Sequence, residues 1–253
     1  MSKRLLQLLR DNSQRPVRNL NIISNDNSTD VYLYDVIDPY WGVDAKSFTE
    51  LLASLKGKPV NLRINSPGGD VFEARAMATA VRQHGNVDTY IDSLAASAAT
   101  YVALAGKTVH MATGAFFMIH QAWTFAYGNS ADLRTTAGLL DKIDASIVAD
   151  YQNKSGQTIE QIQQWMADET WFTAQEAKDN GFIDLIMDSQ PASPAAQAAH
   201  NRVANQADWN LSVYDKVPAA LRETKPKPEP DPIDHPSRIA ALRRMSLLEK
   251  IMP

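Results

Sequence analysis

The sequence predicts an α/β protein built on a mostly parallel sheet, followed by a disordered Pro-rich C-terminal tail. From residue 31 to about residue 187, strand-like segments alternate with amphipathic helices, which is the pattern of crossover units between parallel strands. A hydrophobic fraction of 44% over 253 residues is enough for a substantial core. Beyond residue 188 the chain is rich in Ala, Gln, Ser and Pro, and proline occupies every second position over residues 225–232. Such a composition cannot form a packed core.

The spacing of apolar residues places the elements of the α/β domain in order. Alternation and short apolar runs predict strands at residues 31–37, 60–64, 87–91, 108–112 and 116–120. Apolar residues recurring every three or four positions predict helices at residues 44–55, 71–84, 130–153, 159–166 and 174–180. A further apolar stretch, residues 182–187, follows the last of these helices.

Composition divides the chain into four parts. Residues 1–30 form a polar N-terminal arm, and residues 31–188 form the α/β domain. Residues 189–236 are predicted to be a flexible Ala/Pro-rich linker. Residues 237–253 carry apolar side chains at helical spacing among basic ones, which indicates a short amphipathic segment. That segment is either a docking segment or a fraying tail.

Charge and composition exclude several classes of function. A net charge of -4 and a pI near 5.7 show no overall basic balance, so no nucleic-acid partner is expected. Without cysteine the chain has no disulfide, no cysteine-ligated zinc and no thiol catalysis. No apolar run reaches the roughly 18 residues of a membrane span. Residues 1–10 lack the long apolar core of a signal peptide, so we expect a cytoplasmic protein with no membrane partner.

Ser97 lies in a run of small residues, from Ser93 to Ala99, between a predicted strand and a predicted helix. At such a junction the first amides of the helix are unpaired and point outward. These amides can bind the oxyanion of an acyl-transfer reaction, and the neighbouring side chains are too small to shield the hydroxyl. Because the same run also suits a closely packed Ala-rich helix, its interpretation depends on the residues around it.

A serine nucleophile needs a base, because its hydroxyl is hardly ionised at neutral pH. Of the five histidines, His120 follows an unbroken apolar strand, at the strand end where the active sites of α/β proteins lie. His110 lies inside a strand, and the others fall at a helix end or in the tail. The turn at residues 65–69 adds two glycines, whose unobstructed amides can approach a ligand closely.

Four motifs in this sequence resemble those of the Clp protease proteolytic subunit family, in the same order, over roughly residues 30 to 187. They are Ile64-Asn65-Ser66-Pro67-Gly68-Gly69, Ala95-Ala96-Ser97, Met118-Ile119-His120-Gln121, and Thr173-Ala174-Gln175-Glu176-Ala177 through Gly181-Phe182-Ile183-Asp184. The resemblance implies a crotonase-like (ClpP-like) fold with repeated β-β-α units and a projecting handle helix. It also implies a serine endopeptidase that needs no cofactor or metal and that assembles into a homo-oligomeric ring or double ring.

The resemblance also assigns roles to residues. Ser97 falls on the nucleophile, His120 on the general base, and Gly68 and Ala98 on the amides of the oxyanion hole. The helix at residues 130–153 corresponds to the handle by which family members pair their rings, and its apolar stripe is longer than one small domain needs to bury.

The sequence departs from the family pattern at several positions. Ser93 replaces a glycine, Ala98 replaces a methionine and Ala122 replaces a proline. Counted back without gaps from the following motif, the family's catalytic aspartate falls on Glu169, with Asp168 beside it. A glutamate can still orient the imidazole and stabilise its cation if the backbone allows for its length. We therefore favour Glu169 and keep two alternatives, Asp168 or a solvated helix end with no catalytic role.

These departures and the tail resemble the phage-encoded branch of the family, whose members are thought to act as prohead or head-maturation proteases. The expected partners are then polypeptide substrates such as capsid and scaffold proteins. The features by which bacterial members dock an AAA+ ATPase are not matched here, so the sequence does not demonstrate that partner.

Two other functions stay open at this point. A ring-forming scaffold or interaction protein with weak catalysis is favoured by the altered acid at position 169. An acyl-CoA enzyme of the wider crotonase fold would share the paired oxyanion amides. The combination of Ser97 with His120 argues against the acyl-CoA enzyme, which does not need that pair.

Overall fold

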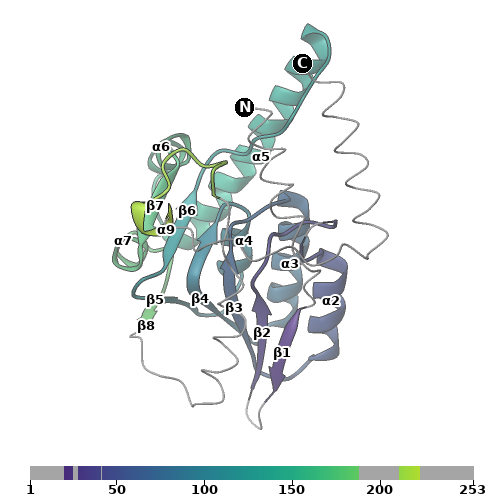
Figure 1. The fold of residues 1–253 in the computed structure, drawn as a ribbon, viewed down its shortest axis with the longest axis vertical. Coiled ribbons are helices and arrows are strands. Elements are labelled where there is room, and N and C mark those ends of the chain that lie inside the picture. The colour runs from purple at the N-terminus through teal and green to yellow at the C-terminus, as the bar shows by residue number, and fades with distance from the viewer. Residues whose placement is uncertain (1–19, 25–27, 41, 188–210, 223–253) are drawn as a thin grey trace.

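One mixed sheet organises the computed structural model, which describes residues 20–24, 28–40, 42–187 and 211–222. Its strands are β1 (Asn21–Ser24), β2 (Thr29–Leu33), β3 (Val60–Ser66), β4 (Val87–Ala96), β5 (Val109–Ala112), β6 (Phe116–Ile119), β7 (Thr170–Thr173) and β8 (Leu185–Met187). The main path of the sheet is β1-β2-β3-β4-β5-β8, and β6 branches from β4 and continues to β7 (Figure 1). Among these strands, β1–β2 and β6–β7 pair antiparallel and the remaining pairs are parallel. The predicted α/β class with a mostly parallel sheet is confirmed.

Helices connect and cover these strands (Figure 1). They are α2 (Ala45–Ser54), α3 (Val71–His84), α4 (Ala99–Ala103), α5 (Ser130–Ser155), α6 (Ile159–Ala167), α7 (Ala174–Asp179) and α9 (Ala219–Arg222). The sequence fixes the ends of α3 locally, because Asp70 accepts the amides of its first turn and Gly85 ends it with a φ of 74°. None of the helices in the described ranges combines the length and the apolar character that crossing a membrane requires.

Strand β4 is longer than the sequence predicts, since it continues past Ile91 to Ala96. Its end is paired on both sides, Ala95 with Ser66 of β3 and Leu94 and Ala96 with residues of β6. Side chains as small as alanine fit a strand buried between two neighbours, so the Ala-rich run is a strand before it becomes a helix. Ser97 lies between a strand and a helix, as predicted, and because β4 is longer than predicted it follows the strand directly.

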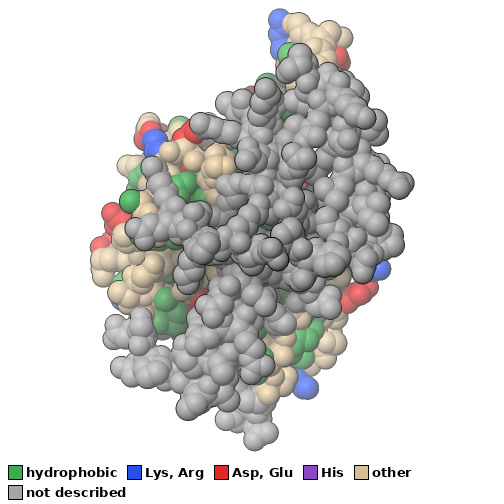
Figure 2. All heavy atoms as spheres, in the orientation of Figure 1, with side chains coloured by type: hydrophobic (Ala, Val, Ile, Leu, Met, Phe, Trp, Pro, Cys, Tyr) green, Lys and Arg blue, Asp and Glu red, His purple; other side chains and the backbone are tan. Residues whose placement is uncertain are grey.

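Helix α5 projects from the body of the molecule (Figure 1), and its outer end carries charged side chains (Figure 2). Only its second half is anchored, by Ile147, Val148 and Tyr151. Leu133 and Leu139, in the first half, are 44% and 52% exposed. The apolar stripe therefore packs within the subunit at one end and lies open at the other.

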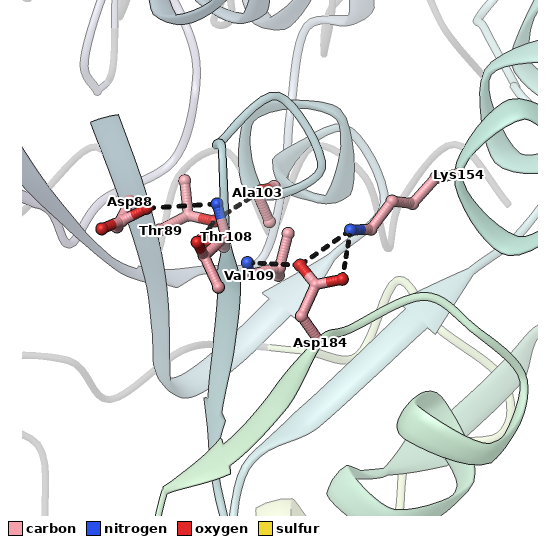
Figure 3. A network of polar contacts seen from close by, with 7 residues as sticks. All are labelled: Asp88, Thr89, Ala103, Thr108, Val109, Lys154 and Asp184. Carbon is pink, nitrogen blue, oxygen red and sulfur yellow. Dashed lines mark hydrogen bonds and ion pairs between the residues drawn. The ribbon is translucent and has the colours of Figure 1, made fainter. Parts of the chain in front are cut away.

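A polar network joins the base of α5 to the sheet (Figure 3). One carboxylate oxygen of Asp184 accepts the Val109 amide at 2.7 Å, and both oxygens accept bonds from Lys154 Nζ at 2.8 and 2.9 Å. Nearby, the Thr89 hydroxyl donates to the Ala103 carbonyl at 2.7 Å and so ties β4 to α4. Burial of Asp184 is outweighed by its bonds from Lys154 and Val109, which hold the pKa of its carboxyl below the ordinary value. These contacts thus hold the C-terminal turn of α5 against β5, and β4 against α4.

The structure differs from the predicted domain boundaries at two places. Residues 21–24, inside the predicted arm, pair with β2 as an edge strand. Residues 211–222, inside the predicted linker, pack against β4 and β6 through Leu211 and Val217, which are buried. The prediction rested on overall composition, whereas these apolar side chains find a complementary surface on the sheet. The rest of the linker and the predicted amphipathic segment at residues 237–253 lie outside the described residues.

Candidate active site

Ser97 occupies a sharp turn between β4 and α4. Its φ of 54° is in the left-handed region, which non-glycine residues rarely adopt and which often marks functional turns. The turn is held from both sides, because the Ser97 amide donates to the Met118 carbonyl at 2.9 Å and Thr100 donates through both its amide and its hydroxyl to the Ser97 carbonyl. A strained and well-supported backbone thus presents the hydroxyl at the end of the strand.

His120 lies directly beside this hydroxyl, with Nε2 2.7 Å from Ser97 Oγ. The two side chains meet because β4 and β6 run parallel, with Ala96 opposite Met118, so both strands end at the same edge of the sheet. The structure therefore brings together the two residues that the sequence predicts as nucleophile and base.

Burial lowers the pKa of His120 to about 4, and the negative charge of Glu169 opposes that shift. The imidazole is therefore neutral at neutral pH, which leaves one ring nitrogen free to accept a proton. A neutral imidazole within hydrogen-bond distance of a serine hydroxyl is the arrangement that general-base activation of that hydroxyl requires.

Gly68 lies against the Ser97 turn. Its φ is +92°, and a Cβ at this position would lie 2.5 Å from the Ala96 carbonyl oxygen and 2.9 Å from the Ala98 amide nitrogen. The Ile37 amide fixes this loop by donating to the Gly68 carbonyl at 2.9 Å. The Gly68 amide itself donates to Ser66 Oγ at 3.2 Å. The two predicted oxyanion residues are thus neighbours, and only glycine fits the contact.

Glu169 also has a left-handed backbone, with a φ of 50°. Its carboxylate accepts three hydrogen bonds, from Trp171 Nε1 at 3.2 Å, from the Asp215 amide at 2.9 Å and from the Lys216 amide at 2.6 Å. Among the described residues no hydrogen bond joins Glu169 to His120, although its charge acts on the imidazole. The predicted acid is therefore near the base and engaged with other donors.

Asp168, the alternative acid, is turned toward a different set of partners. Its carboxylate accepts from Gln164 Nε2 at 2.7 Å and lies 3.5 Å from Lys216 Nζ. The bond from Gln164 and the charge of Lys216 lower the pKa of this exposed group. These contacts make Asp168 a surface carboxylate at the end of α6.

The sequence analysis missed one residue of this site, Tyr214. Its hydroxyl donates to the Pro67 carbonyl at 2.5 Å, and its ring stands edge-on to His120, with centroids 5.4 Å apart. Burial raises the pKa of Tyr214, and a hydrogen bond with the Ser97 side chain opposes the rise. The apolar cluster around it, at residues 211–217, was the available signal within a segment otherwise read as linker.

Comparisons with known proteins bear on the family and the fold of this chain. A family model described as Clp protease matches residues 13–190. The ATP-dependent Clp protease proteolytic subunit of Bacteroides fragilis is 28% identical over 161 residues, which are 62% of this chain and 78% of that protein. The ATP-dependent Clp protease proteolytic subunit 1 of Corynebacterium jeikeium is 32% identical over 142 residues, or 54% and 74% of the two chains.

A solved structure of a ClpP1 mutant from Listeria monocytogenes is similar to this fold, with a TM-score of 0.57 and 22% identity. The similarity covers 64% of this chain and 92% of that chain. It confirms the predicted crotonase-like, ClpP-like fold.

Proposed function

The chain belongs to the Clp protease family, and from this premise we propose that it is a serine endopeptidase with Ser97 as nucleophile and His120 as general base. The observation that carries the proposal is the 2.7 Å distance between Ser97 Oγ and His120 Nε2 at the shared edge of β4 and β6. The neutral state of His120 supports the same assignment, because only a neutral imidazole can accept the hydroxyl proton.

In the proposed reaction, Ser97 Oγ attacks the carbonyl carbon of a substrate peptide while His120 Nε2 takes the hydroxyl proton. The tetrahedral oxyanion is then bound by the amides of Gly68 and Ala98, two residues that lie side by side at the turn, and the Gly68 amide exchanges its bond to Ser66 Oγ for the oxyanion. His120 returns the proton to the leaving amine, and the acyl-enzyme remains on Ser97. A water molecule, deprotonated by His120, hydrolyses that ester and restores the site.

We assign Glu169 as the residue that orients His120 and stabilises its cation during turnover. Its charge already acts on the imidazole, which supports this role over the exposed Asp168. Its carboxylate is held by the amides of Asp215 and Lys216 and makes no described hydrogen bond to His120, so that contact requires the side chain to move.

The proposal extends to a homo-oligomeric ring that encloses the site, and to phage head maturation with capsid or scaffold proteins as substrates. Leu133 and Leu139 on the projecting half of α5 support an assembly, because a contact with another copy would bury these exposed apolar side chains. The phage role rests on the departures from the family pattern at positions 93, 98 and 122.

A second candidate is a ring-forming scaffold in which catalysis is weak. One observation favours it: the Glu169 carboxylate accepts hydrogen bonds from the backbone amides of Asp215 and Lys216 and, among the described residues, not from His120. An acyl-CoA enzyme of the same fold has no comparable support, since it does not need a serine and a histidine in contact.

Covalent labelling with a fluorophosphonate tests the proposal. We expect prolonged incubation with excess probe to modify Ser97, identified by mass spectrometry of the labelled peptide, and to leave the Ser97→Ala variant unmodified. Ser93→Ala, the nearest serine replaced as a control, should label like the wild type. Failure of the probe to modify Ser97 at any concentration, or labelling that persists in Ser97→Ala, would contradict the assignment.

A further inference from the structure

A second apolar cluster lies beside Ser97, on the opposite face of β4 and β6 from the main core. Successive side chains of a strand point to opposite faces, so Ala95 and Phe117 enter the main core while Leu94, Ala96 and Met118 enter this cluster. Phe116 and Trp171 pack against the same cluster, their ring centroids 6.5 Å apart. These residues form an apolar surface, which we call the groove and define as Leu94, Ala96, Phe116, Met118 and Trp171.

The groove is occupied by residues 211–217 of the same chain. Leu211 and Val217 are only 7% and 6% exposed, because they are buried against the groove. Tyr214, between them, reaches the reactive centre: its hydroxyl donates to the Pro67 carbonyl, and its ring stands edge-on to His120 with centroids 5.4 Å apart. The segment therefore lies directly beside the Ser97–His120 pair.

The same segment also engages the proposed acid. The amides of Asp215 and Lys216 donate to the two oxygens of Glu169, at 2.9 and 2.6 Å. The Lys216 ammonium lies 3.5 Å from Asp168. The segment therefore holds Glu169 through main-chain bonds while its apolar side chains fill the groove.

Resting on the proposed function, we propose that residues 211–217 are an intramolecular inhibitor of the peptidase. They occlude Ser97 with Tyr214 and keep the Glu169 carboxylate away from His120. Displacing the segment opens the groove to a substrate peptide and frees the acid to orient the base.

Covalent connection makes such an inhibitor effective even when its intrinsic affinity is weak. The segment belongs to the same chain as Ser97, so its binding at the groove is intramolecular and is favoured by a high effective concentration.

A binding experiment tests occupation of the groove separately from catalysis. It uses full-length chains that carry Ser97→Ala, and a fluorescein-labelled synthetic peptide of residues 211–222. We expect the peptide to bind Ser97→Ala/Val217→Asp, because the added charge expels the internal segment, and to bind Ser97→Ala at least tenfold more weakly. Ala220→Asp, an exposed position of the same segment, is the matched control and should behave like the parent.

Two further variants keep this test decisive. Tyr214→Ala in the chain, which removes bulk without adding charge, should also open the groove, and a peptide carrying Val217→Asp should not bind. Equal binding to the opened and unopened chains, or binding to neither, would overturn the inference.

Labelling of otherwise wild-type chains then tests inhibition. We expect Val217→Asp to react with the fluorophosphonate at Ser97 at least tenfold faster than wild type, and the added peptide to slow it again. If wild type and Val217→Asp label Ser97 at the same rate, the proposed function stands and the inhibitory role is refuted. If the peptide binds as expected but no chain is labelled at Ser97, the proposed function fails, and an inhibitory role fails with it.

Discussion

The backbone of Glu169 has a φ of 50°, and its side-chain carboxylate accepts three hydrogen bonds. Left-handed backbone in a non-glycine residue costs about 1–2 kcal/mol, so the surrounding contacts must stabilise it. Two of the three donors belong to residues 215 and 216. The acid is therefore positioned by a segment far away in the chain rather than by its neighbours in sequence.

Replacing this acid by its amide separates the two candidate carboxylates. In the Val217→Asp background we expect Glu169→Gln to lower kcat for peptide hydrolysis strongly, toward the roughly 10⁴-fold loss that follows when a triad acid becomes an amide. Glu169→Asp should be intermediate, because the shorter side chain starts from a backbone adapted to glutamate. Asp168→Asn, the matched control on the exposed carboxylate, should cost little. A large loss of kcat in Asp168→Asn together with a small loss in Glu169→Gln would assign the orienting role to residue 168.

The contact at Gly68 gives a second prediction at the residue scale. Gly57 and Gly68 both have positive φ, but a Cβ at Gly57 meets nothing within 4 Å whereas one at Gly68 meets the Ala96 carbonyl oxygen at 2.5 Å. Gly57→Ala should therefore lower stability by only about 1–2 kcal/mol. Gly68→Ala should shift the oxyanion turn and lower kcat by roughly 10²-fold or more. Thermal unfolding measures the stability of the two variants, and peptide hydrolysis measures their kcat. Equal kcat values in Gly57→Ala and Gly68→Ala would contradict the proposed role of the contact at Gly68.

Among the elements, α5 differs most in its two halves. Ile147 is 2% exposed inside the subunit, so an acidic residue there would unfold the subunit rather than report on assembly. The exposed Leu133 and Leu139 lie on the projecting half, where no described residue covers them. The outer half is therefore where exposed apolar side chains of this helix can be tested as an interface.

Charges introduced on that outer half should weaken assembly. We expect Leu133→Asp with Leu139→Asp to give smaller particles in light scattering while the unfolding midpoint stays close to that of wild type. Ala145→Asp, an exposed position on another side of the same helix, is the control and should leave the particle mass unchanged. An unchanged mass in the double variant would show that these leucines are not at an interface.

At the scale of the whole molecule, acid lowers the free energy of unfolding by protonating histidines that are neutral in the folded state. Burial lowers the pKa of His120 to about 4 from an ordinary value near 6.5, and burial lowers that of His110 as well. Between about pH 4 and pH 6.5 the unfolded chain binds more protons than the folded chain. Protonation of these histidines therefore does not reduce the free energy of unfolding above about pH 6.5, and reduces it increasingly as the pH drops toward 4.

Removing His120 should flatten this dependence. At about 1.4 kcal/mol per pH unit, the wild type should lose at most about 3 kcal/mol through His120 between pH 6.5 and 4, in addition to the loss through other groups. Urea unfolding of wild type and His120→Gln at pH 7 and pH 4.5 measures the difference. Parallel losses in the two proteins would show that His120 is not desolvated in the folded state.

The order of strands and helices, and the positions of Ser97 and His120 within it, follow from the sequence. Apolar periodicity predicted the alternation of strands and helices, and placed Ser97 between a strand and a helix and His120 at the end of a strand. These predictions succeed because strand and helix boundaries depend on nearby residues, and because parallel strands align their carboxyl ends at one edge. Which side chains meet at that edge was therefore within reach of the sequence.

Only the tertiary structure decided what surrounds the two residues. The full length of β4 depends on pairing with β3 and β6, and the burial of Ile147 depends on how α5 crosses the body. The engagement of Glu169 and the position of Tyr214 require a segment more than forty residues further along the chain to return to the sheet. Composition averages over such a segment, whereas a few apolar side chains that fit an exposed groove are enough to bind it beside Ser97.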